Sequence, residues 1–174
     1  MKPRYVVDTN VLIAASAGNA PHSVIAKDAT PDNPDLRLKV LEWLTDFQQS
    51  STRLVLDYQW EIDKEYRRKM DYFNDFGLQV IQNKWDNCAV DLVDVVYDDH
   101  GHALLQEPLQ TIVHDCSDRK MVAAAVEAIN YYGETTIANA SDSDWYEWEA
   151  GLLAAGVIVE QILDDWLRPK YNQR

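Results

Sequence analysis

Five carboxylates lie where an apolar segment ends or where a helical pattern begins. They are Asp8, Glu65, Asp118, Asp142 and Asp144. Carboxylates that a fold brings together repel one another, so they either shift their pKa values or are neutralised by a bound cation. Mg²⁺ and Mn²⁺ prefer such oxygen ligands, and two of these ions can clamp the attacking and leaving oxygens of a phosphodiester displacement. The chemistry that these residues predict is metal-dependent hydrolysis of a phosphodiester bond.

The assignment of individual ligands stays open at two of these positions. Glu61 lies one helical turn before Glu65 and competes with it. Asp142 and Asp144 are two residues apart, so an extended backbone points both side chains to the same side, and either can be the ligand. Asp115 is interpreted as a helix cap or as a group that supports the ligands.

Asp8 and Asp118 also have a structural interpretation. Each precedes a helical pattern, where a carboxylate can cap the first turn or interact favourably with the helix dipole. The run Asp8-Thr9-Asn10 directly follows an apolar strand pattern, however, and this favours a ligand at its first position.

Polar and basic residues near the carboxylates are candidates for binding a substrate, the basic ones through its phosphates. They are Asn10, Arg68, Arg119 and Lys120. The alternative for the basic residues is an ordinary solvated helix face. Trp145 and Tyr146, beside the last acidic segment, are candidates for stacking on a base. The pair of histidines in His100-Gly101-His102 is interpreted as part of a solvated turn, because no further ligand lies nearby in the sequence.

Short apolar runs and longer periodic segments alternate along the chain. The predicted strands are Tyr5–Val7, Arg53–Asp57, Val90–Val96 and Thr135–Ala140. The predicted helices start at about Val11 and then cover Leu36–Gln49, Tyr58 to about Phe73, Leu78–Trp85, Met121–Ile129 and, as a long C-terminal helix, about 147–167. The proline-containing segment 28–35 is a predicted loop. This alternation favours an α/β domain with a parallel sheet, whose site lies beyond the carboxyl ends of the strands.

The acidic composition limits how the chain can bind nucleic acid. Its 174 residues include 16 Lys and Arg against 29 Asp and Glu, which gives a net charge of −13. Most of the field repels phosphate, which argues against a general nucleic-acid coat protein and predicts local or metal-mediated binding. The length and the 47% hydrophobic composition favour a single globular domain spanning 1–174.

Cysteine content and the longest apolar run bear on location and partners. The two cysteines, Cys88 and Cys116, are too far apart in sequence to suggest a disulfide scaffold, and a reducing, cytoplasmic compartment fits them. The run Ala150–Val159 is too short to span a bilayer, so no membrane association is expected. The same run could be buried in a homodimer, which makes a second copy of the chain a candidate partner.

The segment Tyr5–Ile13, in which Asp-Thr-Asn follows a strand and leads into an apolar helix, resembles the opening of PIN-domain nucleases. Three later segments resemble the family's other motifs in the right order. Glu65-Tyr66 is similar to its helical glutamate, 118–125 to its third acidic motif, and 142–145 to its fourth. The resemblance covers residues 5–145, which is nearly the whole chain.

The resemblance implies a three-layer α/β/α fold with a mainly parallel central sheet. It also implies an Mg²⁺- or Mn²⁺-dependent ribonuclease or structure-selective nuclease. Of these we expect an endoribonuclease acting on single-stranded RNA, with RNA preferred to DNA. Asp8, Glu65, Asp118 and Asp142 would be ligands of one or two ions, with Asp144 as a competing or additional ligand. An antitoxin protein is a candidate partner, although a processing enzyme is an equally open interpretation.

Two other functions compete with the nuclease. A catalytically silent PIN-like module for binding or assembly would keep the acids without turnover. A phosphohydrolase of the haloacid dehalogenase type needs a second aspartate two residues after the first, and Asn10 occupies that position. No Ser/His/Asp or Cys/His arrangement offers a nucleophile, so water activated by a bound metal is the expected attacking group.

Overall fold

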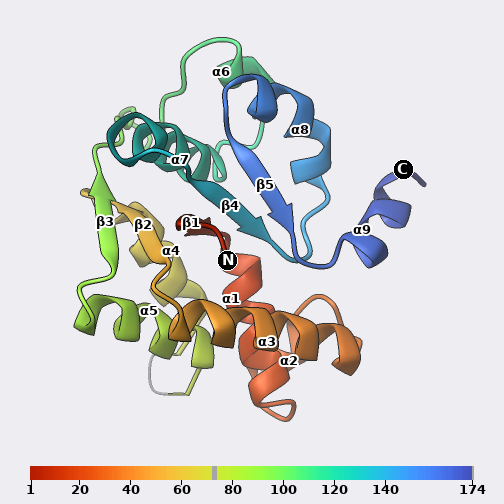
Figure 1. Ribbon diagram of the computed structural model, residues 1–174. Helices are drawn as coiled ribbons and strands as arrows, with labels where there is room; N and C mark the ends of the chain where they lie inside the picture. The colour runs from red at the N-terminus through yellow and green to blue at the C-terminus, as the bar shows by residue number, and fades with distance from the viewer. Residues whose placement is uncertain (72–73, 174) are drawn as a thin grey trace.

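The computed structural model describes residues 1–71 and 74–173, which fold around one five-stranded sheet (Figure 1). The strands are β1 (Arg4–Val7), β2 (Arg53–Asp57), β3 (Val90–Val93), β4 (Thr136–Asn139) and β5 (Ile158–Gln161). They lie in the order β3-β2-β1-β4-β5, and every neighbouring pair is parallel. The predicted α/β class with a mainly parallel sheet is confirmed.

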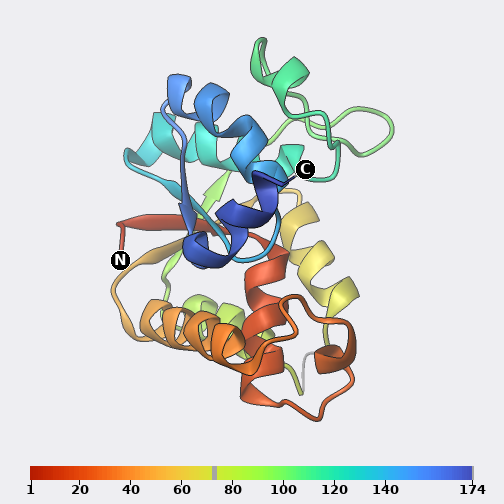
Figure 2. The same cartoon turned by 90° about the vertical axis from the view of Figure 1, so that its right-hand side faces the viewer.

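Helices cover both faces of this sheet. They are α1 (Thr9–Asn19), α2 (Ile25–Asp28), α3 (Pro34–Gln49), α4 (Glu61–Lys69), α5 (Phe76–Asp86), α6 (Leu109–Ile112), α7 (Arg119–Tyr132), α8 (Asp144–Ala154) and α9 (Asp164–Tyr171). Figure 1 shows α1, α3 and α5 below the sheet and α7 and α8 above it, and Figure 2 shows the same layers from the side. The fold is therefore a three-layer α/β/α domain. In the part of the chain that the structure describes, no helix is long and apolar enough to cross a lipid bilayer.

The central strands are apolar because helices cover both of their faces. Every residue of β4 is buried, and Tyr5, Val6 and Val7 of β1 have no exposed surface. Helix α7 packs on the sheet through small buried side chains, including Ala124 and Ala128, which let the two backbones approach closely. This packing fixes the carboxyl ends of β1 and β4, where the candidate site lies.

Most predicted elements are confirmed with shifted ends. β2 has the predicted bounds, whereas β3 is shorter than predicted at its carboxyl end. Helix α4 begins later than predicted because Trp60 adopts a left-handed conformation with a φ of 67°. It ends before Met70, whose backbone is extended, and the predicted end at Phe73 lies outside the described residues.

The predicted C-terminal helix at 147–167 is wrong. Helix α8 ends at Ala154, Gly156 takes a left-handed conformation with a φ of 81°, and β5 then pairs in parallel with β4. Helix α9 begins only at Asp164. The β-branched run Val157–Val159 is compatible with helix or strand by composition, and pairing with the edge of β4 decides for a strand. The apolar run predicted as a dimer surface is therefore divided between α8 and β5.

Candidate functional site

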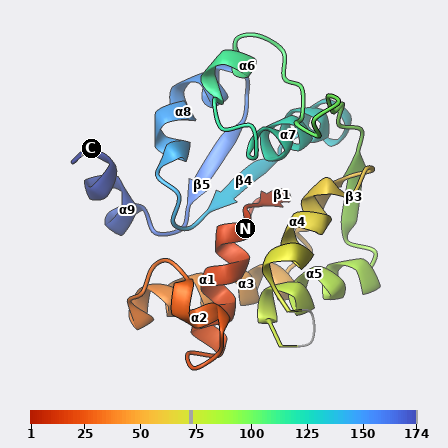
Figure 3. The same cartoon turned by 180° about the vertical axis from the view of Figure 1, so that it is seen from behind.

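The carboxyl ends of β1 and β4 meet beside the start of α1 and helix α4 (Figure 3). Val7 pairs with Ala138, and the Asp8 N–H donates to the Ala138 carbonyl at 3.0 Å. An open cavity of about 430 Å³ lies at this point. We call it the acidic cavity, because its lining includes Asp8, Glu65, Asp115, Asp118 and Asp142.

Asp8 is held by α1 and by a tryptophan. One carboxylate oxygen accepts from the Asn10 N–H at 2.9 Å and so caps α1, and the other accepts from Trp145 Nε1 at 2.7 Å. Burial raises the pKa of Asp8 to about 6 against these two donors, and the charges of Asp142 and Glu65 add to the rise. Asp8 is therefore both a helix cap and a wall of the acidic cavity.

Glu65 reaches the cavity because the end of β2 orients α4. The Asp57 carboxylate accepts from the first two backbone N–H groups of α4, both at 2.9 Å. Glu65 then faces Thr9, whose hydroxyl donates to Glu65 Oε1 at 2.6 Å. Glu61 instead pairs with Lys64 at 2.6 Å and does not line the acidic cavity. Of the two alternatives, Glu65 is the one that lies with the other carboxylates.

Two lysines neutralise Glu65. Lys120 Nζ lies 2.7 Å from Glu65 Oε2, and Lys69 Nζ lies 3.5 Å from Glu65 Oε1. Burial opposes the ionisation of Glu65, but the hydrogen bonds from Lys120 and Thr9 and the charges of both lysines outweigh it and lower its pKa. Glu65 is consequently ionised, although the other carboxylates that line the acidic cavity repel its charge.

A pair of asparagines fixes the segment that carries Asp142. Asn10 donates to Asn139 Oδ1 at 2.9 Å, and Asn10 Oδ1 accepts from the Ala140 N–H at 2.9 Å. The Asn139 amide donates to the Asp142 carbonyl at 2.6 Å. Asp142 lines the acidic cavity, whereas Asp144 begins α8 and donates its N–H to Asp142. Asn10, predicted to bind substrate, links the ends of β1 and β4.

Asp118 precedes α7 and accepts no hydrogen bond on its carboxylate from the residues that the structure describes. Burial, followed by the charges of Asp8 and Asp115, raises the pKa of Asp118 to about 8. Asp115 is the opposite case, because the Ser117 hydroxyl donates to it at 2.7 Å and lowers its pKa. The charge of Asp118 is therefore less compensated than those of Asp8, Glu65 and Asp115.

The carboxylates line one cavity without forming a closed set of ligands. Within residues 1–71 and 74–173, no group of three or more His, Cys, Asp or Glu side chains could hold a metal ion as they are placed. Two of the carboxylates have partners within the chain, since Glu65 pairs with Lys120 and Asp142 accepts from the N–H of Asp144 at the start of α8. For Glu65 to become a ligand, it would have to exchange its lysine partner for the ion.

The basic candidates differ in how far their charges are engaged. The Arg119 guanidinium donates to the carbonyls of Val113 and Gln110 at 2.9 and 3.0 Å, so it ties the segment around α6 to α7. Lys120 is engaged by the ion pair described above. Arg68 lies exposed on α4 and makes no hydrogen bond or ion pair with the described residues. Arg68 is therefore the candidate whose charge is available to a phosphate.

The aromatic residues predicted to stack on a base are buried instead. Trp145 has no exposed surface and packs edge-to-face against Trp148, while Tyr146 is 6% exposed and donates its hydroxyl to Asp164 at 2.7 Å. The stacking prediction is wrong for both rings. The indole of Trp145 positions Asp8, a role that depends on a contact between distant segments.

The histidine pair lies in the predicted turn, where Asp98 accepts from the N–H groups of His100 and His102 at 2.8 and 2.9 Å. His100 is exposed, as the interpretation of a solvated turn requires. The turn also borders a cavity of about 380 Å³. This cavity adjoins the acidic cavity, because Glu65 and Ser117 line both.

Sequence reasoning missed the residues that position the carboxylates. Asp57 was indistinguishable from any strand end, and the contact of Thr9 with Glu65 joins residues far apart in the chain. A signal existed for Asn139, which is a polar residue at the end of the apolar strand pattern of β4, in the position that corresponds to Asp8.

No protein-family model matches this chain, and no curated protein or solved structure matches it either. The resemblance to PIN-domain nucleases stays a prediction from sequence motifs.

Proposed function

We propose that the protein is a metal-dependent nuclease that hydrolyses phosphodiester bonds at the acidic cavity, with single-stranded RNA as its preferred substrate. The observation that carries the proposal is the convergence of Asp8, Glu65, Asp118 and Asp142 from four distant segments on one open cavity. Burial, and after it the like charges of neighbouring carboxylates, opposes ionisation of Asp8 and Asp118 and raises the pKa of both groups. Such perturbed groups cluster at functional sites.

The donor set fits a hard divalent cation. The carboxylates offer oxygen ligands, and among the described lining residues there is no thiol or imidazole that would favour a softer metal. Asp8, Asp118 and Asp142 would hold Mg²⁺ or Mn²⁺, with Glu65 joining them once it is free of Lys120. Such an ion, when bound, supplies charge neutralisation, a water of lowered pKa and polarisation of the phosphate.

The protein's own side chains would bind and orient the strand. Lys69 lines the acidic cavity, and Arg68 lies next to it with an unengaged guanidinium, so both can contact phosphate oxygens on either side of the cut. Two further cavities, of about 810 and 380 Å³, adjoin the acidic cavity. Cavities of this kind suit the splayed bases of a single strand better than a stacked duplex.

Cleavage assays with labelled single-stranded and structured RNA and DNA test the proposal. We expect cleavage of single-stranded RNA with Mg²⁺ or Mn²⁺ and none in EDTA. Asp8→Asn and Asp118→Asn should each lower the rate at least about a hundredfold, the scale on which loss of one electrostatic group at a reacting centre acts. Asp46→Asn, which changes an exposed carboxylate of α3 outside the acidic cavity, is the matched control and should cleave normally.

Two outcomes would contradict the proposed metal-dependent nuclease activity. One is cleavage that continues in EDTA, and the other is the absence of cleavage on every substrate with both metals. Full activity in Asp8→Asn and Asp118→Asn would place the reaction outside the acidic cavity.

A catalytically silent module for binding or assembly is the second candidate, and one observation favours it. The Lys120 ammonium, 2.7 Å from Glu65 Oε2, supplies a cation from the chain itself at a proposed ligand. A silent module of this kind would not be stabilised by Mn²⁺. If the protein is a metal-dependent nuclease, Mn²⁺ should raise its thermal unfolding temperature, because a ligand that binds only the folded state stabilises that state.

A further inference from the structure

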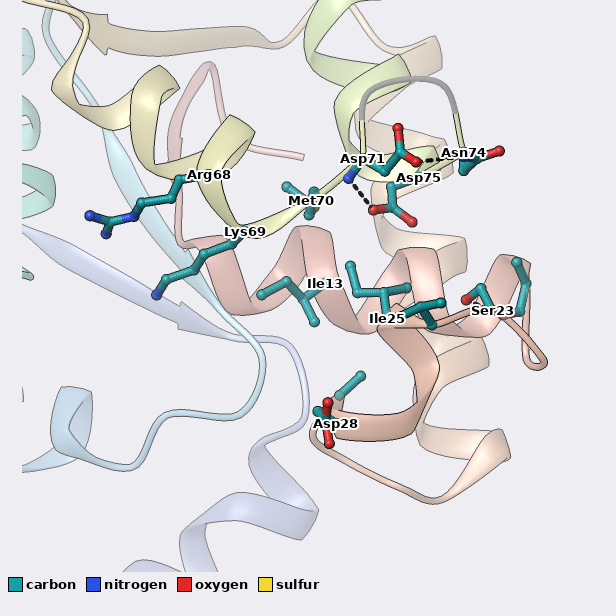
Figure 4. Close-up of a pocket in the computed structure, with 13 residues that line it drawn as sticks. Ile13, Ser23, Ile25, Asp28, Arg68, Lys69, Met70, Asp71, Asn74 and Asp75 are labelled. Atoms are coloured by element: carbon teal, nitrogen blue, oxygen red, sulfur yellow. Dashed lines mark hydrogen bonds between the residues drawn. The ribbon is translucent and has the colours of Figure 1, made fainter.

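A second cavity of about 810 Å³ lies beside the acidic cavity, between α1, α2 and the end of α4 (Figure 4). Ile13 and Lys69 line both cavities, so the two adjoin. We call the second one the apolar cavity, because Ile13, Ile25 and Met70 contribute to its mainly apolar wall. Its volume lies in the range of roughly 300–1,000 Å³ that small-ligand sites typically have.

Charged groups lie at separate ends of the apolar cavity. Figure 4 shows Arg68 and Lys69 at one end and Asp71 with Asp75 at the other. At this acidic end, the Asp75 carboxylate accepts from the Asp71 N–H at 2.6 Å, so Asp75 already has a hydrogen-bond partner within the chain. The basic end is the one that adjoins the acidic cavity, because Lys69 lines both. A phosphate next to the proposed cutting point would therefore meet Arg68 and Lys69.

Asp28 borders the cavity on the far side of Ile13 from Lys69 in Figure 4. Its carboxylate makes no hydrogen bond or ion pair with the residues that the structure describes. An ionised carboxylate can accept two parallel N–H groups at once. Among the RNA bases, guanine presents two adjacent N–H donors on its pairing edge, whereas uracil presents one N–H between two carbonyls. The apolar wall and Asp28 together thus match one base better than the others.

We infer that the apolar cavity binds the base of one nucleotide beside the scissile phosphate of a single strand, and that it selects guanine. The base packs on Ile13 and Ile25, its pairing edge meets Asp28, and its phosphate lies against Arg68 and Lys69. The inference rests on the proposed function, because it takes the adjoining acidic cavity as the place where the strand is cut.

The test uses hexauridylate and six variants of it that each carry one guanosine at a different position. Binding is measured by fluorescence anisotropy with Ca²⁺ and the Asp8→Asn protein, so that the RNA stays intact. We expect one guanosine position to bind about tenfold more tightly than hexauridylate, the scale of one two-pronged base contact. Adding Asp28→Asn should remove this preference. Adding Arg68→Gln should weaken the binding of all seven RNAs alike, because a phosphate contact does not depend on base sequence. Asp46→Asn is the matched control and should keep the preference.

The inference is overturned if no position favours guanosine, or if the preference survives in Asp28→Asn. Cleavage of RNA by the wild-type protein without any guanosine preference would remove the guanine subsite and leave the nuclease intact. A guanosine preference lost in Asp28→Asn, in a protein that cleaves no substrate with Mg²⁺ or Mn²⁺, would support the subsite and overturn the nuclease.

Discussion

The fold opposes ionisation of Asp118 more strongly than that of Asp8, which lines the same acidic cavity. The pKa of Asp118 is about 8 in the folded chain, against an ordinary value of 3.8. Between these values the unfolded chain binds fewer protons than the folded chain, so the free energy of unfolding falls as the pH rises from about 4 to about 8. Asp8, with a pKa of about 6, acts in the same direction over the lower part of this window.

Asp118→Asn should therefore stabilise the metal-free protein at alkaline pH. In EDTA at pH 8 we expect a gain of at least about 1 kcal/mol, seen as a rise of roughly 2–4 °C in the thermal unfolding temperature. The gain should shrink at pH 5, where the folded chain keeps the proton on Asp118. Asp115→Asn, at a carboxylate whose pKa is lowered, should give no gain at either pH. Equal stability of Asp118→Asn and wild type at both pH values would contradict the assigned pKa.

Lys120 competes with any cation for Glu65, and this competition can be measured. Lys120→Met should raise the affinity for Mn²⁺ severalfold, because the Glu65 carboxylate no longer has an ammonium at 2.7 Å. Lys69→Met is the matched control and should have the smaller effect, since Lys69 Nζ lies 3.5 Å away. Titration calorimetry reports both affinities. An unchanged affinity in Lys120→Met would show that Glu65 is not a ligand.

At the scale of elements, the break between α8 and β5 depends on Gly156. Its φ of 81° lies in the left-handed region, and a Cβ there would meet no neighbouring atom within 4 Å, so any cost of a side chain comes from the backbone. Gly156→Ala should lower the free energy of unfolding by about 1–2 kcal/mol in urea. Gly156→Asn should cost less, because asparagine tolerates this conformation better. In a continuous helix at 147–167 the change to alanine would instead stabilise the protein by about 1 kcal/mol, so the sign distinguishes the two structures.

At the scale of the whole molecule, net charge limits how the protein can hold nucleic acid. Two bound divalent ions would change the charge from −13 to −13 + 4 = −9, so the body still repels phosphate. Arg119 is engaged with backbone carbonyls, and Arg67 pairs with Asp63 at 2.6 Å. Attraction is therefore confined to the ion and to the few cations around the acidic cavity.

RNA binding by Asp8→Asn should consequently be weak in EDTA and stronger with Ca²⁺. Its dependence on salt should be shallow, with a log–log slope of about −2 or less steep, since each phosphate contact on a single strand contributes about −0.7. Anisotropy measured across a salt series checks both expectations. Tight binding in EDTA with a steep slope would reveal an extended basic surface and contradict local, metal-centred recognition.

The sequence alone determined the elements whose pattern is local. β2 has its predicted bounds, and the strand before Asp8 is confirmed because a short β-branched run that ends in a cap can form little else at that place. The parallel sheet then follows from alternation of strands and helices. It brings Asp8, directly after β1, and Asp142, in the segment after β4, to one side.

Only the tertiary structure decided the features that join distant segments. Glu61 and Glu65 are equivalent in a helical pattern. The hydrogen bond from the first turn of α4 to the Asp57 carboxylate orients the helix so that Glu65 reaches the acidic cavity. The pairing of Lys120 with Glu65 likewise follows from how α4 and α7 pack. The run Val157–Val159 forms a strand because the edge of β4 beside it is available for pairing. Hydrogen bonding to that edge outweighs the weak preference for helix or strand that the apolar run 150–159 has by composition.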